Sequence, residues 1–329
     1  ESVRTQLLTG TRDDDVLIGF DNRADTLDGG EGSDALEGGQ GNDTYRFDLG
    51  YGADSIRDTG GVDRIVFGQA ISSAMLEFSN EDGDLLIRLK GASDSLIVLG
   101  GASRSSSAQH IETLEFSDGS TLQIEEILQQ LVRQQATDGA DVIDARTGVP
   151  ITVTGGLNDD LIIADNKTTM LFRAGDGSDV VDARYGIAGS QLIFVDLASD
   201  EAVIRRPDLS SGDLIIAFPD SGDQVLVRGV LTGLNVPQIT FADDVSWTKE
   251  EFIAAAIRFQ STDRADFIRG SDDDDTITPG LGDDDVNGSY GNDTYVFRRG
   301  DGRDVIADPS GTDTLQIRGY RAEEVKISR

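Results

Sequence analysis

The sequence predicts a mainly β protein in which blocks of parallel β-roll alternate with small antiparallel β-caps, each ending in a short helix. Three observations lead to this prediction. A nine-residue Asp/Gly repeat recurs in blocks, alternating apolar residues fill the stretches between them, and the 329 residues include 39 Gly but only 6 Pro. That excess of glycine indicates repeated backbone positions with positive φ rather than a stiff linker.

The nonapeptide is clearest at residues 29–46, where two copies of G-G-x-G-x-D-x-U-x follow each other directly, U being a large apolar residue. A period of nine is incompatible with a helix or an unbroken strand, because successive U side chains would point to opposite faces. The remaining solution is a short strand around each U residue, preceded by a Gly-rich turn. Successive strands then stack into a coil with every U side chain inward.

Aspartates continue the frame beyond these two copies. In the first block each is followed two residues later by Leu, Ile or Tyr, and the series is Asp15, Asp25, Asp34, Asp43, Asp54 and Asp63. About 250 residues further on the block returns as Asp266, Asp275, Asp284, Asp293, Asp304 and Asp313. A weaker middle copy keeps Asp141, Asp160 and Asp179 but has Thr169 where another aspartate is expected. Tyr45 and Tyr295 occupy the U position, so we expect them in the core.

A second module lies between these blocks and is also repeated. Residues 83–87 match 212–216 and residues 94–98 match 223–227, both 129 residues apart. Alternating apolar residues between Asp/Gly turns predict short antiparallel strands. Each module ends in a predicted helix, at 124–132 and at 249–257, the second with a capping box of Thr248 and Glu251. We expect Trp247 to pack the second helix against its sheet.

The predicted order of modules is a β-roll at 9–66, a β-cap with helix at 67–135, a degenerate roll at 136–191, a second β-cap with helix at 192–260, a roll at 261–316, and the opening of a third, truncated cap at 317–329. Residues 1–5 have neither Met nor the basic and apolar regions of a signal peptide. We therefore expect the chain to be a fragment of a larger protein.

Composition excludes several classes of function. Lys+Arg number 28 against Asp+Glu 61, a net charge of -33, which repels nucleic acid and attracts cations. The absence of Cys excludes disulfides and thiolate metal sites. One histidine, His110, argues against a His-based metal site, and we expect it on the surface. The sequence contains no run of about 18 apolar residues, so no membrane span is predicted.

The nonapeptides resemble those of the RTX (haemolysin-type calcium-binding) family, and the intervening modules resemble the β-rich related domain found beside such repeats. The resemblance implies a secreted bacterial protein, extracellular or at the cell surface, exported by type I secretion machinery and binding several Ca2+ ions. The carboxylates it implies as ligands are Asp15, Asp25, Asp34, Asp43, Asp54, Asp63, Asp160, Asp179, Asp266, Asp275, Asp284, Asp293, Asp304 and Asp313. The turn carbonyls it implies are those of Gly30, Gly32, Gly39, Gly41, Gly50, Gly52, Gly280, Gly282, Gly291, Gly300 and Gly302.

Stacked aspartates make the metal necessary for folding. Two nonapeptides form one coil, so Asp34 is expected to stack between Asp15 and Asp54, and Asp43 between Asp25 and Asp63. Two carboxylates about 4.8 Å apart repel by about 3.5 kcal/mol at an effective dielectric constant of 20. A core of one U residue per nonapeptide offsets little of this repulsion, so folding is expected to be coupled to Ca2+ binding. The middle block, with fewer carboxylates, is expected to hold at most one or two ions.

Three functions remain open. The first is a calcium-binding structural module of a secreted protein that folds after type I export. The second is a repeated structural unit of an adhesin, surface layer or fibre, in which neighbouring modules of the chain are the partners. The third is the non-catalytic part of a secreted protease, lipase or polysaccharide-modifying enzyme. The sequence has no H-E-x-x-H, no G-x-S-x-G and no Cys nucleophile, so we predict no catalysis within the chain.

Overall fold

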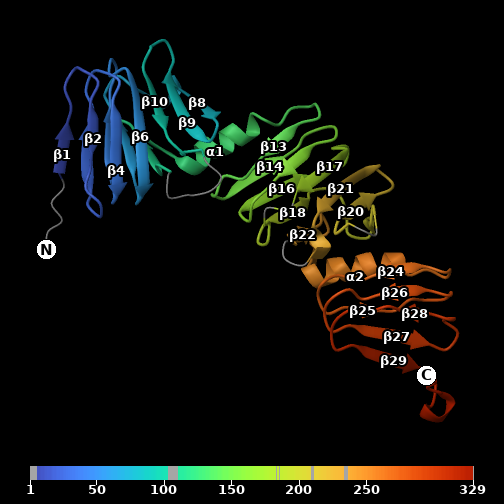
Figure 1. Cartoon of the computed structure of the whole chain (residues 1–329). Coiled ribbons are helices and arrows are strands. Elements are labelled where there is room, and N and C mark those ends of the chain that lie inside the picture. Colours follow the sequence, from blue (N-terminus) through green and yellow to red (C-terminus); the bar gives the residue numbers. More distant parts are fainter. Residues whose placement is uncertain are drawn as a thin grey trace. The chain divides into compact units, whose positions relative to one another are not determined.

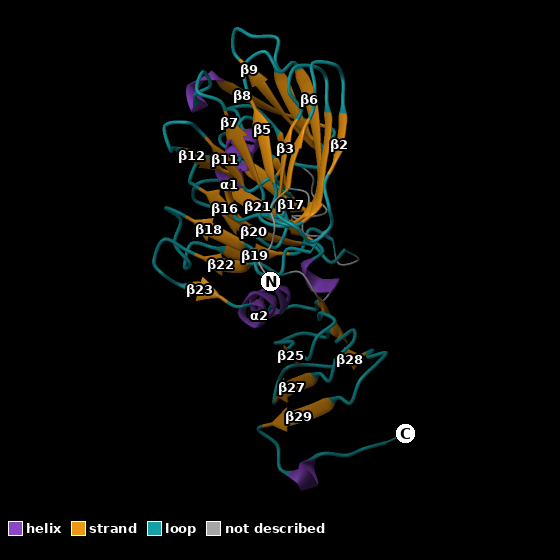
Figure 2. Ribbon diagram, turned by 90° about the vertical axis from the view of Figure 1, so that its left-hand side faces the viewer, coloured by secondary structure: helices purple, strands orange, loops and turns teal. Residues whose placement is uncertain are grey.

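The computed structural model describes residues 6–102, 110–182, 184, 186–208, 211–232 and 236–328. The chain divides into two compact units, one of Glu1–Gln135 with Arg146–Thr152 and one of Ala136–Ala145 with Val153–Arg329, and each is described separately. Strands dominate both units, as Figure 2 shows, and α1 and α2 are the α-helices of the described residues. The mainly β prediction is confirmed.

In the first unit the nonapeptides form two facing parallel sheets, and successive strands alternate between them (Figure 1). Leu27, Tyr45 and Ile65 pair across one sheet, and Leu36 pairs with Ile56 in the other. All five U side chains are at most 1% exposed, as the frame predicts. The strands are β1 (Gln6–Thr9), β2 (Val16–Ile18), β3 (Asp25–Asp28), β4 (Ala35–Gln40), β5 (Thr44–Phe47), β6 (Ala53–Gly60) and β7 (Arg64–Phe67).

The first cap continues both sheets. Strands β8 (Leu76–Glu81), β9 (Asp84–Leu89) and β10 (Ser95–Val98) form an antiparallel meander, and β11 (Thr113–Glu115) pairs antiparallel with β12 (Thr121–Gln123). However, β10 pairs in parallel with β6, and β11 pairs in parallel with β7. The strands of the cap are therefore antiparallel among themselves, as predicted, and at these two junctions the parallel hydrogen bonding of the roll runs on into the cap.

The second unit contains a roll, a cap and another roll. The middle roll and its cap again form two sheets, of β13-β15-β17-β21-β20-β19 and of β14-β16-β18-β22-β23, and the last roll forms sheets of β24-β26-β28 and β25-β27-β29. Their bounds are β13 (Val142–Asp144), β14 (Ile151–Thr154), β15 (Leu161–Ile163), β16 (Thr168–Phe172), β17 (Ser178–Asp182), β18 (Gln191–Phe194), β19 (Val203–Arg205), β20 (Leu214–Phe218), β21 (Asp223–Arg228), β22 (Gln238–Thr240), β23 (Ser246–Trp247), β24 (Phe267–Arg269), β25 (Thr276–Ile277), β26 (Asp285–Asn287), β27 (Thr294–Arg298), β28 (Val305–Ile306) and β29 (Thr314–Arg318).

Each predicted helix is present. Helix α1 is Ile124–Arg133 and α2 is Lys249–Gln260, so α2 continues past residue 257. At the start of α2, the Glu251 N–H donates to Thr248 Oγ1 at 3.3 Å, and the Thr248 N–H donates to Glu251 Oε2 at 2.9 Å. Trp247 stacks on the buried Phe252 of this helix, with 6.3 Å between ring centroids. The capping box and the packing role of Trp247 are both confirmed.

Two expectations from the sequence are wrong: the exposure of one residue and the register of another. His110 is 2% exposed, so it lies in the interior of the first cap rather than on its surface. In the middle roll, Thr168 and not Thr169 takes the place of an aspartate, because Thr168, Met170 and Phe172 are the buried residues of β16. Both errors arise where the nine-residue frame is interrupted and gives no register.

Candidate metal centres

The in-frame aspartates are stacked along the two edges of the first roll. On one edge, Asp34 Oδ1 accepts the backbone N–H of Asp15 at 2.8 Å, and Asp54 Oδ1 accepts that of Asp34 at 3.0 Å. On the other edge, Asp43 Oδ1 accepts the N–H of Asp25 at 2.8 Å and Asp63 Oδ1 that of Asp43 at 2.7 Å. We call each such series an aspartate ladder. One oxygen of each carboxylate therefore joins its coil to the coil before it.

The same ladders occur in the second unit. In the last roll, the acceptor carboxylates and their N–H donors are Asp284 with Asp266, Asp304 with Asp284, Asp293 with Asp275, and Asp313 with Asp293, at 2.8 to 3.1 Å. In the middle roll one ladder joins Asp141, Asp160 and Asp179 at 2.8 and 3.0 Å. The opposite edge has the buried, uncharged Thr168 and Ser190 instead.

Seven ladder aspartates have a second carboxylate oxygen, Oδ2, that is buried without a hydrogen-bond partner. This holds for Oδ2 of Asp34, Asp43, Asp54, Asp63, Asp160, Asp284 and Asp293. A charged oxygen withdrawn from water without a partner is strongly destabilising, and such groups in proteins are normally paired or bind a metal ion. These atoms are therefore the strongest candidates for metal ligands among the predicted residues.

Backbone carbonyls supply the other half of a donor set. A Cβ atom added to Gly30 would lie 2.4 Å from Thr11 O, and one added to Gly282 would lie 2.4 Å from Arg264 O. The glycines predicted in the turns all have positive φ, for example 91° at Gly30. Since glycine lacks Cβ, the carbonyl oxygens of one turn face open space beside the next. Carbonyl and carboxylate oxygens are the hard donors that Ca2+ prefers, so the residues fit this ion.

Four predicted ligands open a ladder and differ from the rest. Asp25 Oδ2 accepts the N–H of Phe20 at 2.6 Å, and its Oδ1 is buried without a partner. Oδ2 of Asp15 accepts the N–H and the hydroxyl of Thr11, at 2.6 and 2.8 Å. Asp266 accepts the same two groups from Thr262, and Asp275 accepts them from Ser271. The first aspartate of these ladders thus has its Oδ2 satisfied by the chain itself.

Sequence reasoning missed carboxylates that the caps contribute. Oε2 of Glu112 accepts the N–H of Asp63 at 2.6 Å and so extends a ladder into the first cap. Asp94 Oδ1 accepts the N–H groups of Gly50 and Gly52, at 3.0 and 2.9 Å. In the second unit Asp223 accepts the N–H of Gly175 with Oδ2 at 2.9 Å and that of Gly177 with Oδ1 at 3.0 Å. The signal for the last two was present, because Asp94 and Asp223 stand 129 residues apart in matching segments.

Asp21 is a further residue outside the nine-residue frame that the structure brings to a turn. Its Oδ1 would lie 2.9 Å from a Cβ atom on Gly39. At Gly30 the corresponding neighbour is a backbone carbonyl oxygen, that of Thr11. A side-chain oxygen therefore takes the place of a carbonyl at this turn.

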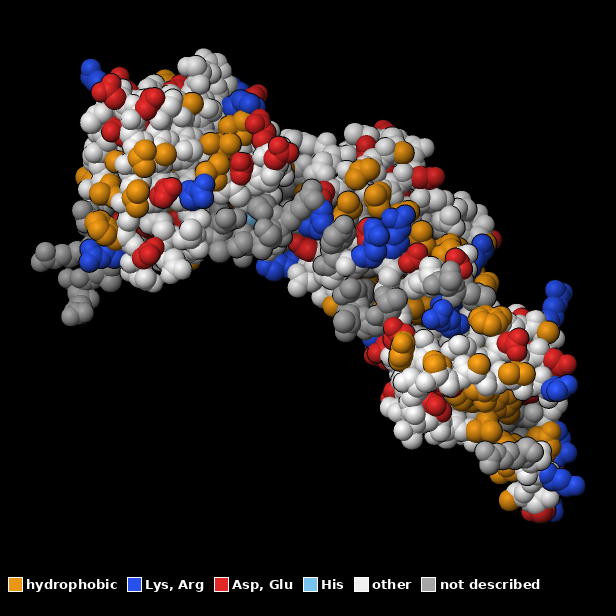
Figure 3. Space-filling model, viewed as in Figure 1, with side chains coloured by type: hydrophobic (Ala, Val, Ile, Leu, Met, Phe, Trp, Pro, Cys, Tyr) orange, Lys and Arg blue, Asp and Glu red, His pale blue; other side chains and the backbone are white. Residues whose placement is uncertain are grey.

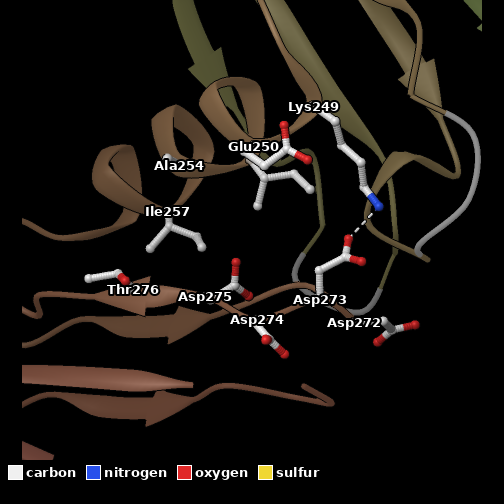
Figure 4. Close-up of a pocket in the computed structure, with 10 residues that line it drawn as sticks. Lys249, Glu250, Ala254, Ile257, Asp272, Asp273, Asp274, Asp275 and Thr276 are labelled. Atoms are coloured by element: carbon white, nitrogen blue, oxygen red, sulfur yellow. Dashed lines mark ion pairs between the residues drawn. The ribbon is translucent and has the colours of Figure 1, made fainter. Parts of the chain in front are cut away.

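A lysine lies beside the first turn of the last roll. Figure 4 shows α2 above Asp272–Asp275, with Lys249 directed at Asp273, and the two side chains form an ion pair with Nζ and Oδ2 2.5 Å apart. Ile253 and Ile257 of α2 line the same cavity, whose volume is about 630 Å³. Beside the turn that leads to Asp275, the positive charge of Lys249 is thus already paired with a carboxylate.

Burial makes several ladder carboxylates hard to ionise. It raises the pKa of Asp43 to about 6, of Asp54 and Asp179 to about 7, and of Asp63 to about 8, against the lowering effect of the N–H that each accepts. Neighbouring carboxylates add to each increase. By contrast, Figure 3 shows acidic side chains dispersed with basic ones over the exposed face in view. The buried acids are thus the ones whose charge depends on pH and on a cation.

We expect the pKa shifts to make calcium binding pH-dependent. A folded pKa above the unfolded value stabilises the metal-free fold at acid pH, and this stabilisation is lost as pH rises through about 6 to 8. Ca2+ must displace those protons, so its apparent affinity should fall at least about tenfold from pH 8 to pH 6. Calorimetric titration at both pH values measures this, together with the protons released. Equal affinities would show that these aspartates are not ligands.

Comparison with known proteins agrees with this geometry. The family model of the RTX calcium-binding nonapeptide repeat matches residues 9–45 and 260–295, and that of the haemolysin-type calcium binding protein related domain matches residues 84–126. Over 121 residues the chain is 35% identical to the iron-regulated protein FrpA of Neisseria meningitidis serogroup C. That match covers 35% of this chain and 11% of the relative, so the chain spans a small part of that protein.

Among solved structures, the chain is similar to the extracellular lipase LipA from Serratia marcescens, with 21% identity and a TM-score of 0.25. The match covers 75% of this chain and 39% of the lipase. Neither of the helices described here has the length and apolar content that a membrane span requires. The first and last blocks thus match the model of the RTX calcium-binding nonapeptide repeat, and the first cap matches that of the related domain, so the comparisons support Ca2+ as the cation of these repeats.

Proposed function

We propose that the chain is a calcium-binding structural module of a secreted protein, which folds on binding Ca2+ after export by a type I system. The observation that carries the proposal is the set of buried Oδ2 atoms without partners along the aspartate ladders. A chain that stays unfolded where Ca2+ is scarce and folds where it is abundant suits export in an unfolded state. The predicted module boundaries and ligands form part of this proposal.

The proposed ligands are the unpartnered Oδ2 atoms of the aspartate ladders and the carbonyl oxygens of the adjoining glycine-rich turns. Each ion held at a free concentration 100 times its Kd adds about 2.7 kcal/mol to the free energy of unfolding. Several ions together therefore match the roughly 5–15 kcal/mol of an ordinary domain. Binding on this scale is sufficient to control folding of the rolls.

Titration with Ca2+ followed by far-UV circular dichroism tests the proposal. In EDTA the rolls are expected to lack β signal and to gain it cooperatively at millimolar Ca2+. Mg2+ at the same concentration should have little effect, because it requires octahedral geometry and releases its water reluctantly. Identical spectra in EDTA and in Ca2+ contradict the proposal.

A second candidate function is a repeated structural unit of an adhesin, surface layer or fibre. It is favoured by the recurrence of the roll-and-cap arrangement, in which parallel pairing joins β6 to β10 in the first unit and β17 to β21 in the second. We expect such units to resist extension once Ca2+ is bound. Single-molecule stretching would support this role if the unfolding force with Ca2+ greatly exceeded that in EDTA.

A further inference from the structure

A second kind of carboxylate cluster lies where the first roll joins its cap. Asp43, Asp58 and Asp63 each offer one carboxylate oxygen, and these atoms all lie within 4.8 Å of one another. All three residues are buried, with at most 1% of their surface exposed. Asp43 and Asp63 directly precede β5 and β7 of one sheet, whereas Asp58 lies within β6 of the other. The cluster therefore draws on both sheets, unlike the turn sites along a single edge.

A tyrosine fixes Asp58 in this cluster. Tyr45 Oη donates to Asp58 Oδ2 at 2.5 Å and accepts the N–H of Gly38 at 2.9 Å, while Asp58 Oδ1 accepts the N–H of Gly60 at 2.9 Å. A Cβ atom on Gly38 would lie 2.2 Å from Tyr45 Oη, 2.6 Å from Asp43 Oδ2 and 2.8 Å from Asp58 Oδ2. These oxygens thus converge on one point, which is open because residue 38 is glycine.

Two oxygens of the cluster have no partner. Oδ2 of Asp43 and of Asp63 are buried without a hydrogen bond, and within the described part of the chain no Lys or Arg forms an ion pair with any of the three aspartates. Glu112, bonded to the N–H of Asp63, adds a fourth carboxylate nearby. Ligand oxygens on opposite sides of a Ca2+ ion are roughly 4.6–5.2 Å apart. The spacing in the cluster fits that ion.

The last roll contains the corresponding residues in a more exposed setting, with Asp293 buried, Asp308 half-buried and Asp313 exposed. Asp293, Asp308 and Asp313 form a second cluster within the same 4.8 Å limit. Tyr295 Oη donates to Asp308 Oδ2, and Asp308 Oδ1 accepts the N–H of Ser310 at 3.1 Å. Oδ2 of Asp293 is again buried without a partner. Each position is 250 residues from its counterpart in the first roll.

In the middle roll Asp43, Asp63, Tyr45 and Glu112 all have counterparts of another kind. Strand pairing places Thr168 and Ser190 where the first roll has Asp43 and Asp63. Met170 of β16 takes the place of Tyr45, and Pro237, before β22, takes that of Glu112. Asp43, Asp63 and Tyr45 thus have matching counterparts in the last roll and none in the middle roll. This pattern indicates a common ligand more directly than it indicates separate structural roles.

We propose that Asp43, Asp58 and Asp63 form a Ca2+ site held by side-chain carboxylates of both sheets, oriented by Tyr45 and supported by Glu112, and that Asp293, Asp308 and Asp313 with Tyr295 form its copy. The inference rests on the proposed calcium binding of the chain and adds one ion per outer roll to those in the turns. An ion here joins the two sheets at the point where the roll ends.

Counting bound ions on the whole chain tests the inference. Equilibrium dialysis against Ca2+, with metal analysis of the protein, should show one ion fewer in Asp58→Asn and in Asp308→Asn, and two fewer in the double variant. Asn keeps the size and hydrogen bonding of the side chain but removes its charge. The control is Asp82→Asn, since Asp82 is exposed at the β8–β9 hairpin with φ of 55°, which Asn tolerates. This control should retain every ion.

An unchanged ion count in both single variants, with normal circular dichroism in Ca2+, overturns the inference while leaving the proposed function intact. Absence of bound Ca2+ in the unsubstituted chain overturns both. Should Asp58→Asn fail to fold, Glu112→Gln serves in its place, because glutamine still accepts the N–H of Asp63. It should weaken the binding of one ion about tenfold, and an unaltered titration curve would count against the site.

Discussion

Removal of Ca2+ is expected to abolish amide-exchange protection in residues 9–66 and 261–316 and to reduce it far less in residues 136–191. The outer rolls have ladders on both edges, whereas the middle roll has Asp160 and Asp179 on one edge and Thr168 and Ser190 on the other. Two ions per roll at 100 times their Kd contribute about 5 kcal/mol, or about 10,000-fold in the protection factor. One ion contributes about 100-fold.

Hydrogen exchange followed by mass spectrometry, with and without EDTA, measures these losses segment by segment. The middle roll serves as an internal control for the outer rolls, because it lies in the same chain. Its core does not depend on the ladders and includes Met170, Phe172 and Phe194. Uniform loss of protection across the three blocks would contradict the assignment of ions to the outer rolls. Equal protection in EDTA would contradict calcium-dependent folding altogether.

Replacing Asp34 by alanine is expected to raise the Ca2+ concentration at the folding midpoint at least tenfold. The substitution removes the acceptor of the Asp15 N–H and leaves that donor unsatisfied, which costs about 1–3 kcal/mol. It also removes the Oδ2 atom proposed as a ligand, which is buried and has no partner. The two effects add because one side chain performs both tasks.

Two further variants separate these effects. Asp34→Asn keeps an acceptor for the Asp15 N–H but loses the charge, so it reports on the ligand role alone. Asp82→Ala removes an exposed charge and should shift the midpoint by less than twofold. Circular dichroism titrations of the three variants measure the midpoints. If Asp34→Asn behaved like the unsubstituted chain, the Oδ2 atom would not be a calcium ligand.

Much of this architecture is predictable because the nine-residue frame is local. A U residue two places after each aspartate fixes the inward side chains, and the frame correctly places Leu27, Leu36 and Ile56 in the core. The stacking of Asp34 between Asp15 and Asp54 follows from counting two nonapeptides per coil. Repetition supplies the register that a single strand lacks.

Contacts between the two sheets were not predictable in this way. Tyr45 is a core residue at the U position, as expected, yet its hydroxyl also bonds Asp58, which lies 13 residues on in the opposite sheet. Glu112 meets Asp63 across 49 residues, because β11 joins β7 in parallel. Such contacts depend on how the cap docks, which no periodicity specifies. The only sequence signal was the 250-residue copy of Asp58 at Asp308.

The hydrogen bonds of a ladder all run in one direction. The N–H of Asp15 donates to Asp34, that of Asp34 to Asp54, and on the other edge that of Asp43 to Asp63 and that of Asp63 to Glu112. Each coil is therefore completed by the coil after it, and the last one by the cap. We therefore expect assembly of the first roll to have a polarity, in which the cap is the template on which the final coil forms and order then spreads backwards toward the amino end.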